Sequence, residues 1–397
     1  MAWHLFGSMA TSKLAPSIIS YGATISSSGK AGRWQLALCL FRSMPSAQLL
    51  PNTISCNATI SACGKAGQWQ MALELFSQMP AKKLRPNVIS YNAAISSCSR
   101  GGRWTMASWL LLAMPEAKLA PNTVSYNAAI SSCEKGARWQ VALQLFESMP
   151  QVKLAPDAIS FNALVACLEK QGRWQQALQL FRSMPAFKLT PNVLSYNALI
   201  KCGKAAGEWR LAVHILGSML TTSVAPNHRS YVAAISSCEA AGRWQVALQL
   251  LSSMHLAKLK ADVVSYNATI SCCERKGQWQ VACHLLGSMP DLQLLPDVIS
   301  YSATISSCEK GSWWHLALRL FDSMPSAKLT PDVISYNATI TCCERGGQWQ
   351  LAVELFSSMQ DAEMTPNVVS YNATMFSCAS RSQWQRALQM FSAMSQG

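Results

Sequence analysis

The stretch TVSYNAAISSCEKGARWQVALQLFESMPQVKLAPD, residues 123–157, decides the fold because the chain repeats it about eleven times. Its tryptophan, Trp139, recurs every 35 residues, at positions 34, 69, 104, 174, 209, 244, 279, 314, 349 and 384. Its tyrosine, Tyr126, recurs at the same interval, with Cys56 and Phe161 in its place in two copies. A fixed period without insertions indicates a repeat protein, in which one small unit is stacked along the chain.

Each unit predicts two amphipathic helices. The first has apolar residues at i, i+3, i+4 and i+7, and the second repeats this pattern from Trp139 onward. Ser125, or the Asn or Asp that precedes it, is expected to cap the first helix. The Lys-Gly-Ala-Arg turn at 135–138 supplies a glycine where the first helix stops, and Pro150 and Pro156 keep the linker from becoming helical.

Neither helix can bury its apolar stripe alone, so neighbouring hairpins must cover one another. The sequence therefore predicts an all-α fold, a right-handed α-solenoid of about eleven helix-turn-helix units. Residues 1–17 are expected to form a partial repeat with a second helix and linker, residues 18–367 ten complete repeats, and residues 368–397 a final repeat without its linker. Because the chain opens within a second helix, we expect it to be part of a longer array.

Two features of the unit predict tight packing between hairpins. The alanines equivalent to Ala128 and Ala142 never exceed a methyl group in any copy, which indicates that another backbone approaches them closely. The tryptophan column is expected to belong to the core and not to a ligand platform, because it is in phase with the apolar stripe of the second helix.

The composition limits the possible partners. An excess of 33 Lys and Arg over 19 Asp and Glu gives a net charge of +14, which favours an anionic partner. No apolar run approaches the roughly 18 residues that span a bilayer, so no membrane partner is expected. The 15 cysteines contain no C-x-x-C and mostly share one column, which predicts buried, reduced thiols in a reducing compartment.

Catalysis is not expected from this sequence. The six histidines form no H-E-x-x-H motif, and the chain has no phosphate-binding glycine loop and no deaminase signature. We therefore predict a protein that is not an enzyme and that holds no metal or cofactor.

The repeat resembles the pentatricopeptide repeat family, of the P type with 35 residues. The resemblance rests on the x-x-S-Y-N-A-x-I opening, the G-K-A-G-R-W-like turn, the A-L-x-L-F-x-x-M segment and the closing P-N or P-D, and it extends from Leu5 to Met394. Two departures stand out: tryptophan occupies a column that is usually leucine, and M-P-x-x-K-L replaces M-x-x-x-G-I at the end of the second helix.

The resemblance implies binding of single-stranded RNA, with one base per repeat selected by two side chains. The first is the residue after the tyrosine: Asn57, Asn92, Asn127, Asn162, Asn197, Asn267, Ser302 and Asn337. The second is the last residue of the unit: Asn87, Asn122, Asp157, Asn192, Asn227, Asp297, Asp332 and Asn367. Units with Gly22 or Val232 at the first position are expected to be nearly silent.

These base-reading residues also have a structural alternative. An Asn or Asp before a helix is an ordinary cap, so capping and base recognition remain equally open for the second set. Asn within a helix lowers helix propensity without local gain, which favours a partner for the first set.

By resemblance, Asn with Asp prefers uridine, Asn with Asn a pyrimidine, and Ser with Asp guanine. The implied target is pyrimidine-rich: pyrimidine, pyrimidine, U, pyrimidine, pyrimidine, any base, U, G, pyrimidine. Aliphatic residues would sandwich the bases, and Arg229 interrupts their column: Ile54, Ile89, Val124, Ile159, Leu194, Val264, Ile299 and Ile334.

One cation per unit lies near the end of the first helix and is missing only at Ala240. The candidates for phosphate contacts are Lys65, Arg100, Lys135, Lys170, Lys204, Arg275, Lys310 and Arg345, with Lys30 and Arg381 at the ends of the column. The alternative is a favourable interaction with the helix dipole, and both can hold together. A second lysine column in the linkers is expected to form a solvated rim: Lys13, Lys83, Lys118, Lys153, Lys188, Lys258 and Lys328.

The family resemblance implies a role in organellar RNA processing, stability or translation, in a mitochondrion or chloroplast, with other RNA-processing proteins as further candidate partners. The alternative is a protein-binding scaffold that resembles tetratricopeptide repeats and holds a peptide in the same groove.

Overall fold

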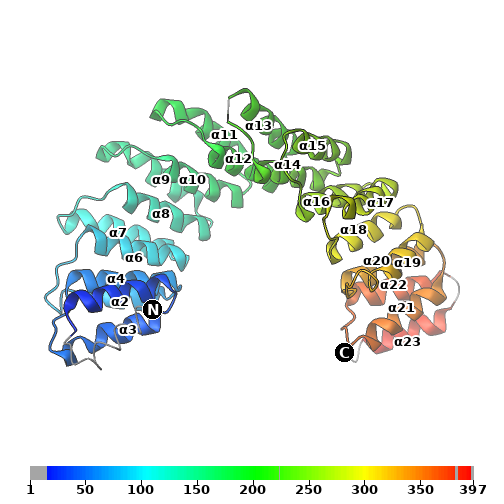
Figure 1. Ribbon diagram of the computed structural model, residues 1–397, viewed down its shortest axis with the longest axis horizontal. Helices are drawn as coiled ribbons and strands as arrows, with labels where there is room; N and C mark the ends of the chain where they lie inside the picture. Colours follow the sequence, from blue (N-terminus) through cyan, green and yellow to red (C-terminus); the bar gives the residue numbers. More distant parts are fainter. Residues whose placement is uncertain (1–15, 223, 381–382, 395–397) are drawn as a thin grey trace. The chain divides into compact units, whose positions relative to one another are not determined.

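The computed structural model describes residues 16–222, 224–380 and 383–394 (Figure 1). Within these residues all regular structure is helical. The partial repeat expected at 1–17 lies outside them except for Pro16 and Ser17, as do Arg381, Lys13 and the last three residues of the final repeat. The chain divides into two compact units, Met1–Cys202 and Gly203–Gly397.

The first unit consists of helical hairpins joined by short linkers. Its elements are α2 (Ile18–Lys30), α3 (Trp34–Ser43), η1 (Pro45–Ala47), α4 (Thr53–Lys65), α5 (Trp69–Ser77), α6 (Val88–Arg100), α7 (Trp104–Glu116), α8 (Thr123–Lys135), α9 (Trp139–Ser148), η2 (Pro150–Val152), α10 (Ala158–Lys170), α11 (Trp174–Ser183), η3 (Met184–Phe187) and most of α12 (Val193–Ala205).

The second unit continues the same alternation. Its elements are α13 (Trp209–Thr221), α14 (His228–Ala241), α15 (Trp244–Leu256), α16 (Val263–Glu274), α17 (Trp279–Ser288), η4 (Pro290–Leu292), α18 (Val298–Glu309), α19 (Trp314–Ser323), α20 (Val333–Arg345), α21 (Trp349–Asp361), α22 (Val368–Ala379) and α23 (Trp384–Met394).

The helices of each unit form two layers. The first helices of consecutive hairpins lie side by side, as α4, α6 and α8 do in the first unit and α16, α18 and α20 in the second (Figure 1). The second helix of a hairpin packs between its own first helix and the next one, as α5 does between α4 and α6. This is the predicted all-α solenoid of helical hairpins.

The first helices begin at the residues that close the preceding repeat. Asn122 is the N-cap of α8, where its side chain accepts a hydrogen bond from the Ser125 backbone N–H and Ser125 reaches back to the cap. Asp157 caps α10 and Asp297 caps α18 through the same reciprocal pair. The capping alternative for these residues is therefore correct, with the Asn or Asp as the cap and the serine as its partner.

The first helix α8 stops at a glycine as expected, because its C-cap is Gly136. In the turn at 135–138 the left-handed residue is Ala137, with φ of 51°, and not Gly136. Gly136 has another role, since a Cβ atom there would lie 2.4 Å from Cδ1 of Trp104 in the preceding hairpin. Most other copies have glycine at the left-handed position, as Gly102 (φ 68°) and Gly347 (φ 70°) do.

The linker lysines hold a strained position and are not simply a solvated rim. Lys118, Lys153 and Lys328 have φ of 57°, 60° and 59°, at the point where the chain leaves the second helix. The family's usual sequence places glycine here, so the M-P-x-x-K-L departure puts a side chain into a left-handed conformation.

The core is formed by alanine, methionine and cysteine columns. Ala142 and its described equivalents from Ala37 to Ala352 are completely buried, as predicted. The prediction for the Ala128 column holds only in part: Ala233, Ala268, Ala303, Ala338 and Ala373 are buried, whereas Ala58, Ala93 and Ala128 are half-buried. The cysteines of the main column, including Cys63, are buried free thiols, and burial raises the pKa of Cys63 to about 11.

The tryptophans of the repeated column from Trp34 to Trp349 are half-buried and belong to the contacts between hairpins more than to a closed core, and Trp384 is exposed. Arginines of the following hairpin lie over their rings: Arg103 is 4.6 Å from the centre of Trp69, and Arg173 is 5.4 Å from that of Trp139. This cation–π contact explains how a tryptophan can replace the usual leucine and remain partly exposed.

Candidate nucleic-acid interface

In the first unit, the three sets of residues predicted to bind RNA meet in one groove. The groove has a volume of about 580 Å³ and lies over the first helices α4 and α6. Its lining includes the base-reading Asn57, Asn87 and Asn92, the aliphatic Ile54, Ile89 and Val124, and the cations Lys65 and Arg100. The half-buried Ala58 and Ala93 form part of its floor, which explains why that alanine column is not sealed.

The two residues of a repeat that are predicted to read a base bind each other, although they are 30 positions apart. The Nδ2 atom of Asn127 on α8 donates to Oδ1 of Asp157 at the start of α10, at 3.0 Å. The same bond joins four further pairs: Asn57 to Asn87 (3.4 Å), Asn92 to Asn122 (3.3 Å), Asn267 to Asp297 (2.9 Å) and Asn337 to Asn367 (3.2 Å).

The length of this bond depends on the acceptor. It measures 2.9–3.0 Å when the last residue is Asp and 3.2–3.4 Å when it is Asn. An ionised acceptor shortens and strengthens a hydrogen bond. Burial acts to raise the pKa of Asp157, but hydrogen bonds from Ser160, Asn127 and the Ile159 backbone outweigh it and hold this pKa below its ordinary value. The carboxylate is therefore ionised at neutral pH.

A serine that the sequence predicts only as a capping residue completes the pair. The Ser160 hydroxyl donates to Oδ1 of Asn127, while Ser125 and Ser300 donate to Asn92 and Asn267, both at 2.6 Å. The signal was available, because this position is serine in all eleven copies, a stricter choice than capping alone requires.

The arrangement is incomplete in several repeats. The amide oxygens of Asn57, Asn162 and Asn337 are buried and accept no hydrogen bond from the described residues. The Ser302 hydroxyl donates to the Ile299 carbonyl oxygen at 3.2 Å, within its own helix. Asp332, its partner in the predicted pair, caps α20. The caps themselves are complete: Asn192 accepts from the backbone N–H and hydroxyl of Ser195, and Asn227 is the N-cap of α14. Asn197 is buried.

The aliphatic column is exposed along both units, which the fold alone does not explain. Ile54 is 73% exposed, Val124 58% and Ile299 60%. The same holds for the other members: Ile89, Ile159, Leu194, Val264 and Ile334. Each stands one helical turn or less before a base-reading asparagine or serine, so apolar surface and hydrogen-bonding groups alternate along the first helices.

The cation column is divided between two roles. The Nζ atom of Lys135 donates to the Arg100 carbonyl oxygen at 2.6 Å, and Lys310 contacts the Arg275 carbonyl in the same way. Two others form ion pairs across repeats, Lys170 with Glu134 (3.6 Å) and Arg345 with Glu309 (2.9 Å). These four therefore serve the helix ends, whereas Lys65 and Arg100 line the groove and Lys204 and Arg275 are exposed.

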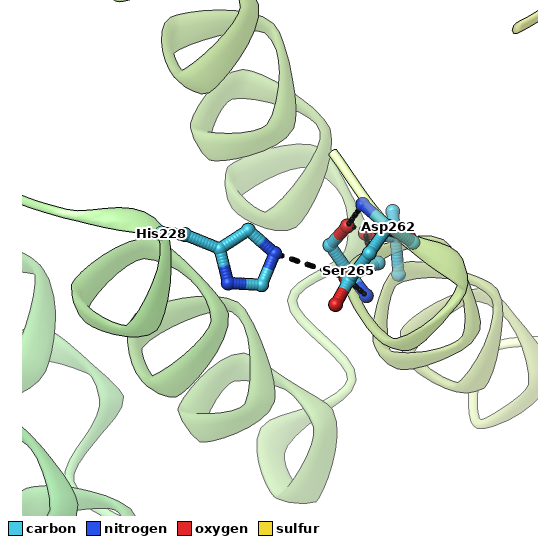
Figure 2. A network of polar contacts seen from close by, with 4 residues as sticks. His228, Asp262 and Ser265 are labelled. Atoms are coloured by element: carbon cyan, nitrogen blue, oxygen red, sulfur yellow. Dashed lines mark hydrogen bonds and ion pairs between the residues drawn. The ribbon is translucent and has the colours of Figure 1, made fainter. Parts of the chain in front are cut away.

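One repeat of the second unit, residues 228–262, differs from the other copies at three positions of its first helix. It has His228 and Arg229 where other copies have aliphatic residues or threonine, and Val232 where most have asparagine. Figure 2 shows the His228 ring of α14 directed at Asp262, next to Ser265 at the start of α16. Nε2 of His228 lies 3.1 Å from Oδ1 of Asp262, an ion-pair distance, although the ring N–H is not aligned for a hydrogen bond.

Other kinds of site are not indicated in the described part of the chain. Residues 16–222, 224–380 and 383–394 contain no group of three or more His, Cys, Asp and Glu side chains that could hold a metal ion. Among the same residues, no helix has the length and apolar character needed to cross a bilayer.

Comparison with known proteins places these hairpins in one family. Models of the PPR repeat family match residues 51–100, 121–168, 156–202, 261–310 and 331–380, and models of the PPR repeat match 19–49, 89–119, 299–329 and 369–396. A search of curated proteins gives no match.

A solved structure shows the same fold. The pentatricopeptide repeat protein PPR10 from maize is 20% identical, with a TM-score of 0.54 over 99% of this chain and 66% of that one, so this chain spans about two thirds of its length. PPR10 in complex with an 18-nt psaJ RNA element gives 20% identity over 99% and 71% of the two chains, at a TM-score of 0.46. Yeast Rmd9p in complex with a 16-nt target RNA gives 12% identity over 91% and 88%, at 0.37. Since the family models match most of its hairpins, the chain belongs to the pentatricopeptide repeat family.

Proposed function

We propose that this protein binds single-stranded RNA selectively, with one base per repeat, and acts by occupying its target and not by catalysis. The observation that carries the proposal is the groove over α4 and α6, where paired Asn side chains, exposed aliphatic side chains and two cations converge. Bases, ribose-phosphate backbone and the gaps between stacked bases each require one of these three chemistries.

The Asn127–Asp157 pair supports a mechanism for choosing uridine. A carboxylate accepts hydrogen bonds only, so it must face the NH₂ group of Asn127, as the 3.0 Å bond has it. The Ser160 hydroxyl occupies the amide oxygen. One N–H of Asn127 is then left to donate to a base. The base edge that meets it carries a carbonyl oxygen in uracil and an amino group in cytosine, so the N–H can donate to uracil but not to cytosine.

The Asn–Asn pairs support a broader preference. Asn87 and Asn122 are neutral acceptors that bind the amides of Asn57 and Asn92 at 3.4 and 3.3 Å, longer than the bonds to Asp, so these amides are held less firmly and turn over at a smaller cost. A turned amide offers its oxygen to the cytosine amino group, and an unturned one offers N–H to uracil. These repeats are therefore expected to accept both pyrimidines.

The complete register runs from the repeat that starts at residue 53 to the one that starts at 333. It reads pyrimidine, pyrimidine, U, pyrimidine, pyrimidine, any base, U, G, pyrimidine. We infer a role in RNA processing, stability or translation in a mitochondrion or chloroplast, since membership of the family supports an organellar setting, and further RNA-processing proteins as partners.

Selection from a randomised pool of single-stranded RNA tests the proposal. The retained sequences should be enriched in pyrimidines in this register. Asn127→Thr should move the preference at the third base from uridine toward guanine, and Asn267→Thr should do the same at the seventh base only, so each variant serves as the control of the other.

Three outcomes would contradict parts of the proposal. A retained pool without this register would overturn the base assignment. Equal weakening of all bases by Asn127→Thr would make this residue structural. Binding that is absent or indifferent to salt would exclude RNA as the ligand and favour a peptide in the groove.

A further inference from the structure

The repeat at 228–262 has lost the groups that select a base. Val232 has no hydrogen-bonding atom at the position where Asn127 and Asn267 donate. The carboxylate that closes the repeat, Asp262, accepts a hydrogen bond from the Ser265 backbone N–H, and Nε2 of His228 lies 3.1 Å from its Oδ1 atom. Figure 2 shows the imidazole of His228 approaching Asp262 from α14.

The same repeat carries its positive charge at a different position of the first helix from the other copies. In every other copy a Lys or Arg stands near the end of the first helix, but α14 has Ala240 there. Instead Arg229 occupies the second residue of α14, where the other described repeats carry an exposed aliphatic side chain. The two positions are eleven residues apart, about 16 Å along a helix.

Arg229 lies where a cation is unfavourable for the helix itself. The N-terminal end of a helix carries positive partial charge, so an Arg in the first turn of α14 is destabilising unless an anion compensates it. Asp262, which closes this repeat, lies 3.1 Å from His228, and Arg229 is exposed and makes no ion pair with the residues that the structure describes.

Resting on the RNA-binding function proposed above, we propose that Arg229 binds a backbone phosphate of the single strand, so that repeat 228–262 anchors the RNA without selecting a base. A guanidinium group can take two phosphate oxygens at once through parallel N–H bonds. His228 contributes by holding Asp262, which keeps the carboxylate from pairing with Arg229. The repeat therefore contributes to the affinity for RNA but not to the choice of its sequence.

The test uses the full chain and a nine-nucleotide RNA with the register given above, with binding measured over a series of KCl concentrations. Arg229→Ile restores the aliphatic side chain of the column. It should weaken binding roughly tenfold near 0.1 M salt, and it should reduce the slope of log K against log salt by about 0.7, the contribution of one phosphate contact in a single strand. Lys260→Gln removes an exposed charge from the same repeat and is the matched control, with little expected effect on either quantity.

Methylphosphonate substitution locates the contact. One uncharged linkage at a time is placed along the RNA. A single uncharged linkage next to the sixth nucleotide should weaken RNA binding by the unmodified protein. The same linkage should leave RNA binding by the Arg229→Ile variant unchanged. Changing the sixth base itself should alter affinity less than about twofold in either protein, because no base is selected there.

The results separate the two proposals. If Arg229→Ile changes neither affinity nor salt slope while the preference at the third base persists, the anchor is wrong and RNA recognition stands. If affinity falls with an unchanged slope, Arg229 stacks on a base and the phosphate contact is wrong. If the unmodified protein does not bind RNA in a salt-dependent way, the proposed function and the anchor both fail.

Discussion

At the scale of single residues, one side chain performs two tasks. Asp157 caps α10, the first helix of the next repeat, through Ser160 and also fixes the amide of Asn127 in its own repeat. Capping and base recognition are therefore not competing explanations for this column, because a carboxylate with two oxygens can serve both. The cap holds the side chain in place, and only a side chain held in place can determine which edge its neighbour presents.

Exchanging the acceptor should exchange the selectivity. Asp157→Asn creates the pair found in the repeat at 88–122 and should broaden the third base from uridine to both pyrimidines, and Asn122→Asp should narrow the second base to uridine. Fixing the amide decides whether one hydrogen bond to the base is formed with uracil or with cytosine. From the net free energy of one hydrogen bond we expect a change in the U-to-C preference of roughly three- to tenfold. Competition binding with RNAs that differ at one base measures it, and a change at both bases in either variant would contradict a local mechanism.

At the scale of the helical hairpin, local strain varies from copy to copy. The turn between the helices needs a left-handed residue, supplied by glycine in most repeats but by Ala137 and Ser312, with φ of 51° and 54°, in two. This conformation is costly for any residue with a Cβ atom, so these turns are weak points of otherwise uniform hairpins.

Relieving that strain should stabilise the protein. Ala137→Gly should raise the free energy of unfolding by roughly 0.5–1 kcal/mol, less than the full strain because glycine also gains freedom in the unfolded chain. Gly102→Ala is the reverse change: its Cβ atom would have only an ordinary contact, 3.6 Å from Cβ of Lys135, so the φ of 68° alone opposes it.

Chemical denaturation of the two variants measures these effects. The midpoint should rise for Ala137→Gly and fall for Gly102→Ala. A fall for both would mean that the backbone at 137 is not left-handed in solution.

At the scale of the whole molecule, the net charge of +14 is distributed in columns that repeat with the hairpins. Some of these cations already serve the helix ends, and others, such as Lys65 and Arg100, face the groove. The total charge therefore overstates how many phosphates the protein can contact, and the salt dependence of binding reports the smaller number.

Neutralising the groove should reveal this difference. The double variant Lys65→Gln with Arg100→Gln should reduce the slope of log K against log salt by about 1.4, because two contacts are lost at about 0.7 each. Lys83→Gln with Lys118→Gln removes the same charge from the linkers and is a conservative control, since Gln48 and Gln293 occupy the equivalent left-handed position. Equal effects of the two double variants would show that the positive charges act through the overall electrostatic field of the protein and not through direct contacts with phosphates.

The sequence by itself determined the hairpins. The 3.6-residue spacing of apolar side chains and the Asn or Asp before each first helix are local features, so the positions of α8 and α9 follow from residues a few places apart. The columns expected to face RNA were identifiable too, because eleven copies show which positions change and which do not. A period of 35 fixes how often a feature recurs, but not which side chains of adjacent repeats meet.

Only the tertiary structure decided which side chains of adjacent repeats are in contact. The bond between Asn127 and Asp157, the serine that completes it, the arginine over Trp139 and the half-open Ala128 all depend on how one hairpin lies on the next. Such contacts join residues about one repeat apart, and their geometry is fixed by packing between helices, for which no pattern within a single helix carries information. The same stacking leaves Arg229 exposed and places Nε2 of His228 3.1 Å from Asp262, and so distinguishes the repeat at 228–262 from its neighbours.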